Sequence, residues 1–340
     1  MKKKILCFLL LPFALMSVNA QNENEVLDQA KAVTDALQKK VDEVAVCYGK
    51  ESETPKNWKL SGVMGLNFSQ AAFKNWAGGG VNTVALSAYL NAGAYYKKNK
   101  ITWDNDLALE YGMLYDKEDF KKNVDKIDIT SKFGFQVAPK LSWSTLVNAK
   151  SQFANGYDYD TDPYTKVSHF GAPAYLLLST GIDWKPDDHF SLYFSPATGK
   201  FTFVEGHHFL PKYDEEGKLL PEDELVSWQE SYGFDKDKRD KHARGEFGTY
   251  LKLQYKRDLC ENVNLATKAD FFTAYTHDFG NIDVDWEVIL SMKVNKFLTA
   301  TLTTELKYDD DVKFIDDKGE SHGARIQFKE LLGIGLMYKF

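Results

Sequence analysis

The chain has 340 residues, a formal charge of −7 and 14% aromatic residues, with 18 Tyr, 23 Phe and 7 Trp. This acidic balance argues against a nucleic-acid partner. After the leader described below, no segment reaches the ~18 apolar residues of a membrane helix. A low mean hydropathy of −0.41 with many aromatics is typical of strands whose lipid-facing and lumen-facing residues alternate. A secreted β-sandwich gives similar averages, so the arrangement of the turns has to decide.

Residues 1–20 have the pattern of a signal peptide. Lys2, Lys3 and Lys4 precede an apolar stretch, and the small residues of Val18-Asn19-Ala20 predict cleavage after Ala20. Removal of the three lysines leaves 39 Lys+Arg against 49 Asp+Glu, a formal charge of −10. Cys7 lies inside the apolar stretch and not at the cleavage point, which argues against a lipoprotein.

Residues 21–50 are predicted to form a short periplasmic helix and a linker. Between Glu23 and Ala45, apolar residues recur at three- and four-residue spacing with charges between them. Three roles fit such a helix: packing on the rim of a barrel, self-association as a coiled coil, or entry into the lumen as a plug.

Twelve strands separated by turn signals are predicted in the remaining domain, residues 51–340. Short and long connections alternate along the whole series. Bacterial outer-membrane barrels have this asymmetry, with tight periplasmic turns and longer external loops. It predicts an even number of strands and both termini in the periplasm. The predicted strands are 57–68, 81–96, 101–115, 126–138, 141–153, 173–185, 188–205, 243–256, 263–276, 282–295, 298–308 and 328–340.

One predicted strand, 188–205, contains Pro196 and Gly199. Splitting the strand there gives thirteen strands and breaks the alternation of short and long connections. Pro and Gly are common at β-bulges, so we predict one long strand with a bulge at these residues.

The last strand predicts the environment of the sheet. One face carries Phe328, Leu332, Ile334, Leu336, Tyr338 and Phe340, and the other carries Lys329, Leu331, Gly333, Gly335, Met337 and Lys339. In a bilayer every backbone N–H and C=O has to be paired, so only a closed barrel removes the sheet edges. The predicted fold is therefore all-β: a closed antiparallel transmembrane β-barrel of about 12 strands in the outer membrane of a Gram-negative bacterium.

Assembly of such a barrel implies two kinds of partner, outer-membrane lipids and the barrel-assembly machinery. Tyr338 and Phe340 are the predicted C-terminal assembly signal. Trp and Tyr residues near strand ends resemble the aromatic girdles at a lipid–water interface. The sequence indicates no specific protein partner.

The predicted lumen carries charges of both signs. Mixed signs favour side chains that pair with one another and fill a narrow lumen, because isolated charges there are costly unless hydrated. A patch of one sign would instead indicate ion or sugar selectivity, and the acidic row 283–287 is the best candidate for it. The lumen-facing candidates are Asp283, Asp285, Glu287, Lys293, Asp270, Lys268, Glu305 and Lys307.

No catalytic, metal or cofactor site is predicted. Asp158, Asp160 and Asp162 have calcium-like spacing, but Pro163 stands where an EF-hand loop needs Gly. A looser calcium or lipopolysaccharide-bridging site in the acidic loops stays open, as does zinc at His207-His208. There is no Gly-x-Ser-x-Gly motif. An enzyme is therefore the minority interpretation.

Two cysteines remain after the leader, Cys47 before the first strand and Cys260 in a predicted periplasmic turn. The oxidising periplasm permits a disulfide between them. Such a bridge would staple the helix to the rim.

Several segments resemble a family of Bacteroidota outer-membrane barrels catalogued as domain of unknown function 3078. These segments are 58–70, Phe73-Lys-Asn-Trp-Ala-Gly-Gly-Gly80, 151–157, 170–177, 190–203, 282–286 and 333–340. The resemblance covers about residues 57–340 and implies the fold and the location. It brings no activity and no catalytic residues.

Three functions stay open for this chain. The first is passage of small polar solutes, or envelope or lipid binding, through a narrow charged lumen. The second is a structural or adhesive scaffold that acts through long external loops, above all 206–242. The third is a lipid hydrolase, for which the only support is an analogy of fold.

Overall fold

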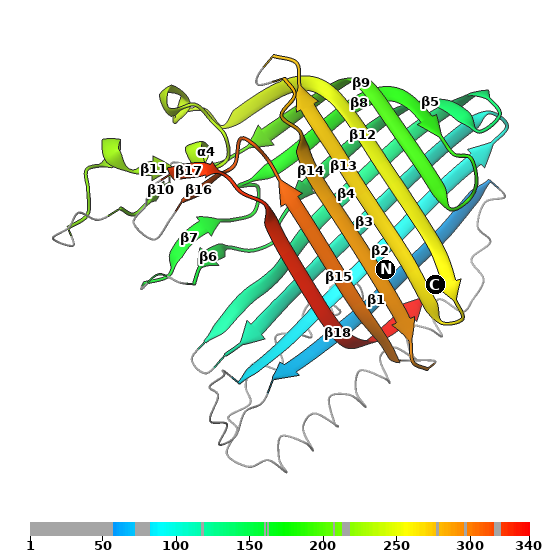
Figure 1. Ribbon diagram of the computed structural model, residues 1–340, viewed down its shortest axis with the longest axis horizontal. Coiled ribbons are helices and arrows are strands. Elements are labelled where there is room, and N and C mark those ends of the chain that lie inside the picture. The colour runs from blue at the N-terminus through cyan, green and yellow to red at the C-terminus, as the bar shows by residue number, and fades with distance from the viewer. Residues whose placement is uncertain are drawn as a thin grey trace, which may run out of the picture. The chain divides into compact units, whose positions relative to one another are not determined.

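Twelve strands form one closed antiparallel barrel in a computed structural model of the chain (Figure 1). The structure describes residues 57–71, 82–116, 119–159, 161, 163–206, 208–212, 218–276, 279–295, 298–315 and 321–340. The barrel strands are β1 (Trp58–Ala71), β2 (Thr83–Lys98), β3 (Ile101–Tyr115), β4 (Phe120–Ala138), β5 (Leu141–Ser151), β8 (Ala174–Trp184), β9 (Phe190–Phe203), β12 (Ala243–Cys260), β13 (Val263–Ala274), β14 (Asp283–Lys293), β15 (Leu298–Tyr308) and β18 (Gln327–Lys339).

The ring order is β1-β18-β15-β14-β13-β12-β9-β8-β5-β4-β3-β2, which confirms the predicted twelve-stranded antiparallel barrel. Most strand limits differ from the predicted ones by a few residues, although β4 begins six residues earlier, at Phe120. The predicted signal peptide, periplasmic helix and Cys47 lie outside the described residues.

Most long connections meet at one end of the barrel, here called the loop end, and short ones at the other, the turn end (Figure 1). The connection between β3 and β4 at the loop end spans only residues 116–119, because β4 begins at Phe120, so the predicted alternation of short and long connections is wrong there. Asn99, Lys140 and Asn262 adopt positive φ in three of the tight turns. Small elements in the long connections were not predicted, because their segments are too short for a periodic pattern. They are β6 (Gly156–Asp158), β7 (Thr165–Ser168), β10 (Phe209–Leu210), η2 (Glu222–Glu224), β11 (Val226–Ser227), α4 (Trp228–Ser231), η3 (Lys236–Lys238), β16 (Lys313–Ile315) and β17 (Ser321–Ala324).

A bulge interrupts β9 at the predicted place. Its register with β8 shifts between Thr180 and Ile182, which pair with Ala197 and Phe194, so Pro196 lies in the extra segment. Gly199 keeps a regular partner, Leu178. The bulge prediction is therefore confirmed at Pro196 and wrong at Gly199.

The barrel closes between the first and last strands. Val63–Phe68 of β1 pair with Ile334–Lys339 of β18. Phe340 extends this ladder, because the amide of Gly62 donates to its carbonyl at 2.9 Å and its amide donates back at 2.9 Å. The Phe340 ring occupies the space that a Cβ on Gly62 would need. A glycine at position 62 therefore lets the C-terminal aromatic seal the seam.

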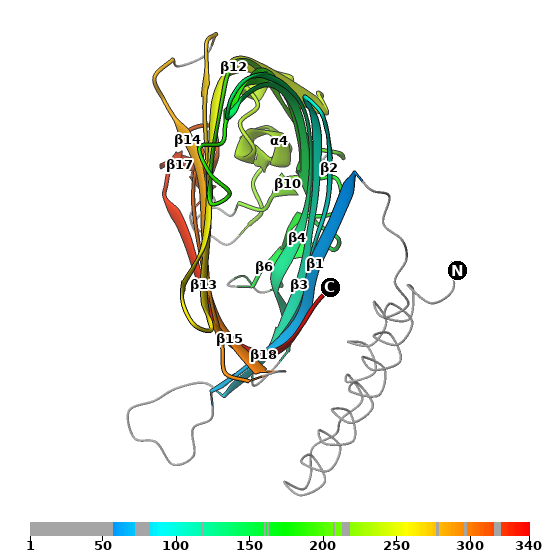
Figure 2. The ribbon, with the colours of Figure 1, turned by 90° about the vertical axis from the view of Figure 1, so that its right-hand side faces the viewer.

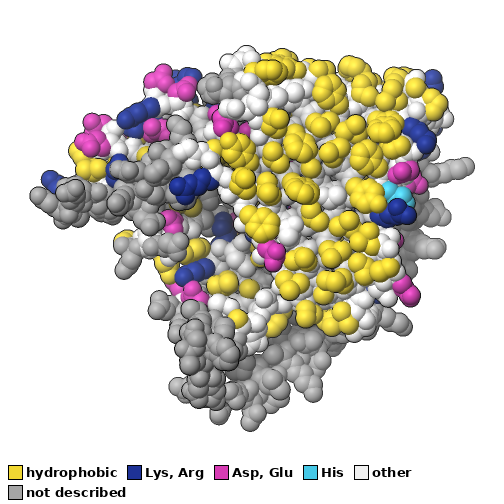
Figure 3. Space-filling view, viewed as in Figure 1, with side chains coloured by type: hydrophobic (Ala, Val, Ile, Leu, Met, Phe, Trp, Pro, Cys, Tyr) yellow, Lys and Arg dark blue, Asp and Glu magenta, His cyan; other side chains and the backbone are white. Residues whose placement is uncertain are grey.

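Hydrophobic side chains cover the face of the barrel over β12–β15, and charged ones gather toward its ends (Figure 3). Side chains alternate between the two faces of a strand, so these apolar side chains point to the outer face of the barrel and not into the lumen. In the described part of the chain, no helix is long and apolar enough to cross a membrane. Exposed apolar residues include Trp103, Ile129, Phe133, Trp143, Phe194, Phe247, Trp286, Phe328, Leu332 and Ile334.

Candidate functional site: a lumen bridged by ion pairs

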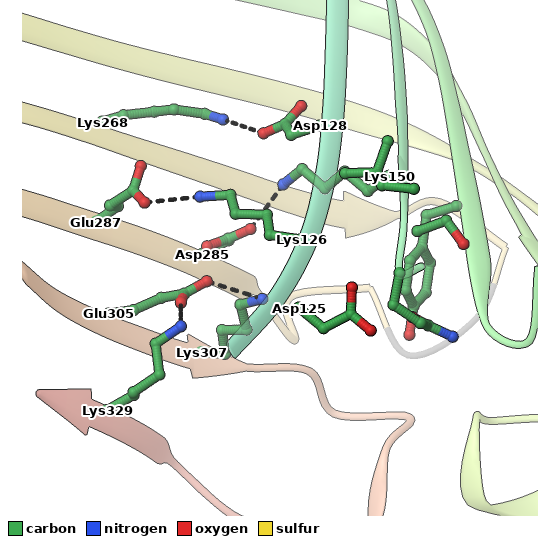
Figure 4. A pocket seen from close by; sticks show the side chains of 14 residues that line it. Asp125, Lys126, Asp128, Lys150, Lys268, Asp285, Glu287, Glu305, Lys307 and Lys329 are labelled. Atoms are coloured by element: carbon green, nitrogen blue, oxygen red, sulfur yellow. Dashed lines mark hydrogen bonds and ion pairs between the residues drawn. The ribbon is translucent and has the colours of Figure 1, made fainter. Parts of the chain in front are cut away.

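Three ion pairs cross the lumen and join opposite walls (Figure 4). In the ring order β4 and β14 are six strands apart, so they face each other. Nζ of Lys126 on β4 lies 2.6 Å from Oε1 of Glu287 on β14. The other two pairs are Lys150–Asp285 at 2.6 Å and Lys268–Asp128 at 2.8 Å between Nζ and Oδ2. Because one lysine and one carboxylate side chain together span the gap, the two walls have to lie close together, and Figure 2 shows a flattened outline of the barrel.

Asp270 on β13 is the centre of a second layer of contacts on one side of these bridges. Its carboxylate lies 3.4 Å from Nζ of Lys252 and 3.7 Å from Nζ of both Lys150 and Lys268. The hydroxyl of Tyr250 donates to it at 2.7 Å. Charge-assisted hydrogen bonds of this kind offset the cost of burying the carboxylate.

A hydrophobic cluster fills the half of the lumen enclosed by β5, β8, β9, β12 and β13. Leu146 and Tyr193 are 0% and 1% exposed, although both side chains point into a barrel. Close packing at this level excludes a water-filled path through this half. The cluster consists of Leu146, Tyr193, Tyr250, Phe272 and Ala274, with Leu177 packed against it.

The opposite half of the lumen, enclosed by β15, β18, β1 and β2, carries small polar residues and glycines. Most of these side chains are half-buried, not packed away. The Tyr89 ring lies over Gly65, where an added Cβ would come within 2.6 Å of its hydroxyl. The glycine therefore lets the ring lie along the wall instead of across the lumen. The inward residues include Ser61, Gly65, Asn67, Ser87, Asn91, Thr301, Thr303, Gly333 and Gly335.

A cavity of about 150 Å³ lies beside the cross-lumen ion pairs. Glu305 at its edge is held by two lysines: Nζ of Lys307 lies 2.9 Å from Oε1, and Lys329 contacts Oε2 (Figure 4). Lysines and carboxylates occur in equal number in the lining. The lining residues are Asp125, Lys126, Ile127, Asp128, Lys150, Ser151, Gln152, Tyr175, Lys268, Asp285, Glu287, Glu305, Lys307 and Lys329.

A third group of ion pairs lies at the loop end of the lumen. Nζ of Lys200 lies 2.6 Å from Oδ2 of Asp283 and 3.0 Å from Oδ2 of Asp309. Arg244 on β12 pairs with Asp311 at 2.6 Å. These contacts tie the connection after β15 to the strands on the other side of the mouth.

The described part of the connection 204–242, here called the cap, lies at the mouth of the lumen. Val204 and Trp228 are 0% and 1% exposed and pack with Phe234 and Ala172 in a small hydrophobic core. The hydroxyl of Tyr232 donates to the carbonyl of Val167 in β7 at 3.1 Å. In Figures 1 and 2, α4 lies at the loop end and within the outline of the barrel.

The single turn α4 is held in place by a capping box. The hydroxyl of Ser227 accepts from the amide of Glu230 at 3.2 Å, and the Glu230 carboxylate accepts from the amide of Ser227 at 3.0 Å. Arg239 donates to the same carboxylate at 2.7 Å. Partial burial by itself raises the pKa of Glu230, but the contacts from Ser227 and Arg239 outweigh it and hold the pKa below its ordinary range.

A buried ion pair stabilises the turn end of the lumen. Nζ of Lys132 lies 2.8 Å from Oδ2 of Asp183, and the two side chains are 8% and 4% exposed. Ser191 donates to Asp183 at 3.1 Å, and Nζ of Lys185 lies 3.6 Å away.

The structure brings seven of the eight predicted lumen residues into these groups. Asp283, Asp285 and Glu287 do not form a free acidic row, because each is paired with a lysine of another strand. Asp270, Lys268, Glu305 and Lys307 belong to the same network. Lys293, six residues after Glu287 and so about 20 Å along the strand, lies at the exposed turn end of β14.

Two of the partner lysines, Lys126 and Lys200, were placed in the lumen only by the observed strand limits and register. Lys126 was predicted as the first residue of its strand, but β4 starts earlier, which brings Lys126 inside the membrane-spanning ladder. Lys200 follows the bulge in β9, which reverses the inward parity of the strand. Carrying the alternation through the predicted bulge would have found it.

The other predicted residues have simpler surroundings. Cys260 is exposed, and the predicted bridge to Cys47 stays a prediction because Cys47 is not described. Tyr338 stacks beside Phe340 with ring centroids 6.2 Å apart. Within the described ranges no cluster of three metal-ligating side chains occurs.

Comparisons with known proteins give one family model and several solved structures. A family model described as "Protein of unknown function (DUF3078)" matches residues 68–157. The closed ring of antiparallel strands and its apolar exterior decide the coarse assignment. The fold is that of an outer-membrane β-barrel. No curated protein matches the sequence.

Solved outer-membrane barrels match this chain at very low identity and with TM-scores below 0.5. The COG4313 outer membrane channel from Pseudomonas putida F1 is 8% identical, with 86% of this chain and 98% of that chain covered and a TM-score of 0.37. The NanC porin is 7% identical, with 82% of this chain and 100% of that chain covered and a TM-score of 0.36. The translocator domain of the autotransporter NalP from Neisseria meningitidis is 9% identical, with 92% of this chain and 98% of that chain covered and a TM-score of 0.34.

Proposed function

We propose that this protein is a channel in the outer membrane of a Gram-negative bacterium, with both termini in the periplasm, that passes small polar solutes. The polar half of the lumen carries the proposal. Its Ser, Thr, Asn and Gly wall is half-exposed, while the other half is packed with Leu146, Tyr193 and Phe272. A barrel that served only to anchor its loops could be packed with hydrophobic side chains throughout, so the half-exposed polar wall favours passage of solutes.

The charges in the lumen define the solutes that fit. The cross-lumen pairs limit the width, so the passage favours small molecules. Equal numbers of lysines and carboxylates line the cavity, so neither sign of ion is attracted as a class. Neutral or zwitterionic solutes with several hydrogen-bonding groups match the alternating donors and acceptors.

The test is conductance of the refolded mature protein in a planar bilayer, together with entry of small sugars and amino acids into liposomes. We expect small steps for the native chain. Replacing one cross-lumen pair, Lys126→Met with Glu287→Met, removes a bridge and should enlarge the steps. The matched control is Lys238→Met with Asp235→Met, an exposed pair in the cap, which should leave them unchanged. A folded protein that gives neither steps nor solute entry in any variant contradicts the proposal.

The cap makes the scaffold interpretation a second candidate. A connection with its own hydrophobic core around Trp228 presents a defined external surface, which suits an adhesive or structural role. A variant in which a short Gly-Ser linker replaces residues 208–241 tests it. Unchanged cell adhesion and envelope integrity in that variant would count against this role.

A lipid hydrolase is the weakest of the three candidates. Its support is an analogy of fold, and Nδ1 of His169, His189 and His242 contacts a main-chain carbonyl oxygen and not a carboxylate. Absence of fluorescent phospholipid turnover by the refolded protein in calcium would remove it.

The resemblance noted in the sequence also leads us to propose a Bacteroidota source, which the matched family model itself does not state.

A further inference from the structure

Every charge in the described lining of the cavity beside the cross-lumen ion pairs has an opposite charge in contact. Figure 4 shows the lysines and carboxylates of this lining meeting from both walls. Asp125 lies 2.8 Å from Nζ of Lys122 and also accepts from the amides of Phe153 and Ala154. The other pairs are Lys126–Glu287, Lys150–Asp285, Lys268–Asp128, Lys307–Glu305 and Lys329–Glu305.

The charges just outside the lining are balanced as well. Asp270 on β13 has Lys252 at 3.4 Å. Lys122, the partner of an aspartate in the lining, adds one positive charge. Glu110 on β3, which lies within electrostatic range of Lys329, adds one negative charge. A net charge on a solute would therefore give up part of its hydration without meeting a free counter-charge, and so would each end of a zwitterion.

The ion pairs leave hydrogen-bonding capacity toward the cavity. An ammonium group has more donors, and a carboxylate more acceptor sites, than one ion pair uses. The side chains of Lys307, Lys329 and Asp285 are 49%, 37% and 29% exposed. Lys307 is the cross-strand partner of Asp285, and Lys329 is that of Glu305, so donors and acceptors are neighbours on this wall. A hydroxyl group both donates and accepts, so it can bind between such neighbours without breaking their ion pair.

One aromatic side chain, Tyr175 on β8, lines the same cavity. It is the cross-strand partner of Lys150 and is half-buried. Its hydroxyl has no hydrogen-bond partner among the described residues, so it can donate to a solute or accept from one. Its ring adds an apolar face to a charged lining, and the apolar C–H face of a sugar ring packs on such a face.

The volume of the cavity limits the size of the solute. About 150 Å³ has room for about five to ten water molecules. This space corresponds to one sugar ring, whereas an oligosaccharide would have to displace the cross-lumen pairs.

We propose that this cavity binds a neutral monosaccharide. The hydroxyl groups of the sugar bridge neighbouring lysines and carboxylates, and its ring packs against Tyr175. The inference rests on the proposed channel function, because it names which of the neutral and zwitterionic solutes the lumen retains during passage.

The first experiment is saturation-transfer NMR on the refolded mature protein in nanodiscs, with sugars that differ at one carbon atom. The probes are methyl glucoside, methyl glucuronide with a carboxylate in place of the primary alcohol, and the analogue with a primary amine there. Glycine is the zwitterionic probe. Methyl glucoside should bind at least about tenfold more tightly than the other three, because each of them brings charges that find no free partner. Equal or tighter binding of any of the three would overturn the proposal.

Two variants test whether the sugar occupies this cavity. Tyr175→Phe removes one hydroxyl and should weaken methyl glucoside binding about twofold to tenfold, the loss of one hydrogen bond. The matched control is Tyr255→Phe on the outer face of β12, which should leave binding unchanged. Lys307→Met leaves Glu305 and Asp285 each with another lysine but gives the lining one excess negative charge. It should therefore raise binding of the amine analogue and lower that of the glucuronide. Unchanged binding in both cavity variants would overturn the assignment.

Conductance and solute entry, measured on the same samples, separate this inference from the channel proposal. Protein that conducts but shows no saturation transfer to methyl glucoside would overturn the sugar site and leave the channel in place. Binding of methyl glucoside by protein that passes no ion or solute would instead overturn the channel, and with it the role of the sugar as a passing solute.

Discussion

Removing the charge of Asp183 is expected to destabilise the barrel strongly. In Asp183→Asn the buried ammonium of Lys132 loses the carboxylate at 2.8 Å, and the Ser191 hydroxyl loses a charged acceptor. Both ion-pair side chains are nearly inaccessible, at 8% and 4%. Water therefore cannot replace the lost contact without opening the packing around Tyr193, whose ring centroid lies 5.9 Å from Nζ of Lys132.

The magnitude follows from the burial. Removing one partner of a buried pair costs about 3–5 kcal/mol, because an uncompensated charge remains. Replacing both partners by apolar residues of similar size is often near neutral. Lys132→Met with Asp183→Leu should therefore recover most of the loss, to within about 1–2 kcal/mol of the native chain. The free energy of unfolding of the double variant measures the net contribution of the ion pair, whereas that of the single variant measures the penalty of leaving Lys132 buried without a partner.

The assay is urea unfolding in lipid vesicles, followed by tryptophan fluorescence and by heat-modifiable migration on gels. Asp235→Asn, in an exposed pair of the cap, is the control and should leave the midpoint unchanged. A loss below about 1 kcal/mol for Asp183→Asn, where about 3–5 is expected for a broken buried pair, would show that this end of the lumen is hydrated. A double variant as unstable as the single one would refute the burial argument.

Three further outcomes are expected. Gly62→Leu displaces the Phe340 ring, so the variant should lower folding yield and lose about 1–3 kcal/mol in urea unfolding; a native midpoint would exclude the seal. Tyr250→Phe removes a 2.7 Å bond to Asp270 and should cost about 1.5–3 kcal/mol by the same measurement, unless water replaces the hydroxyl. Because the folded-state pKa of Glu230 is lowered, its stabilisation is present at neutral pH and is lost as pH falls through about 4.3 toward the folded-state value. Protease cleavage of the cap should therefore rise in acid, and Glu230→Gln should remove that pH dependence; equal acid sensitivity in both would refute it.

Strand number and ring closure were accessible from the sequence because both depend on local patterns. Alternation of period two marks each strand, and turn residues such as Asn99 and Lys140 mark each tight connection. The bulge at Pro196 was predicted for the same reason. Elements within the cap were missed, since a four-residue helix such as Trp228–Ser231 carries no periodic pattern.

The pairing of the lumen charges required the tertiary structure. Alternation places Asp285 and Glu287 on the inner wall, but it does not say which lysines they meet. Lys126 and Glu287 are separated by 161 positions, and Lys150 and Asp285 by 135. Their contact depends on how far the closed ring is flattened, which no local pattern encodes.

The sequence by itself therefore determined the strands, their order around the ring and the apolar exterior, because each follows from neighbours along the chain. The tertiary structure decided that the predicted acidic row is neutralised and that one half of the lumen is packed while the other stays polar. It also decided that the pairing of β1 with β18 ends at Phe68 and Ile334. These features arise between strands far apart in the chain, where only the closed geometry of the barrel sets the distance.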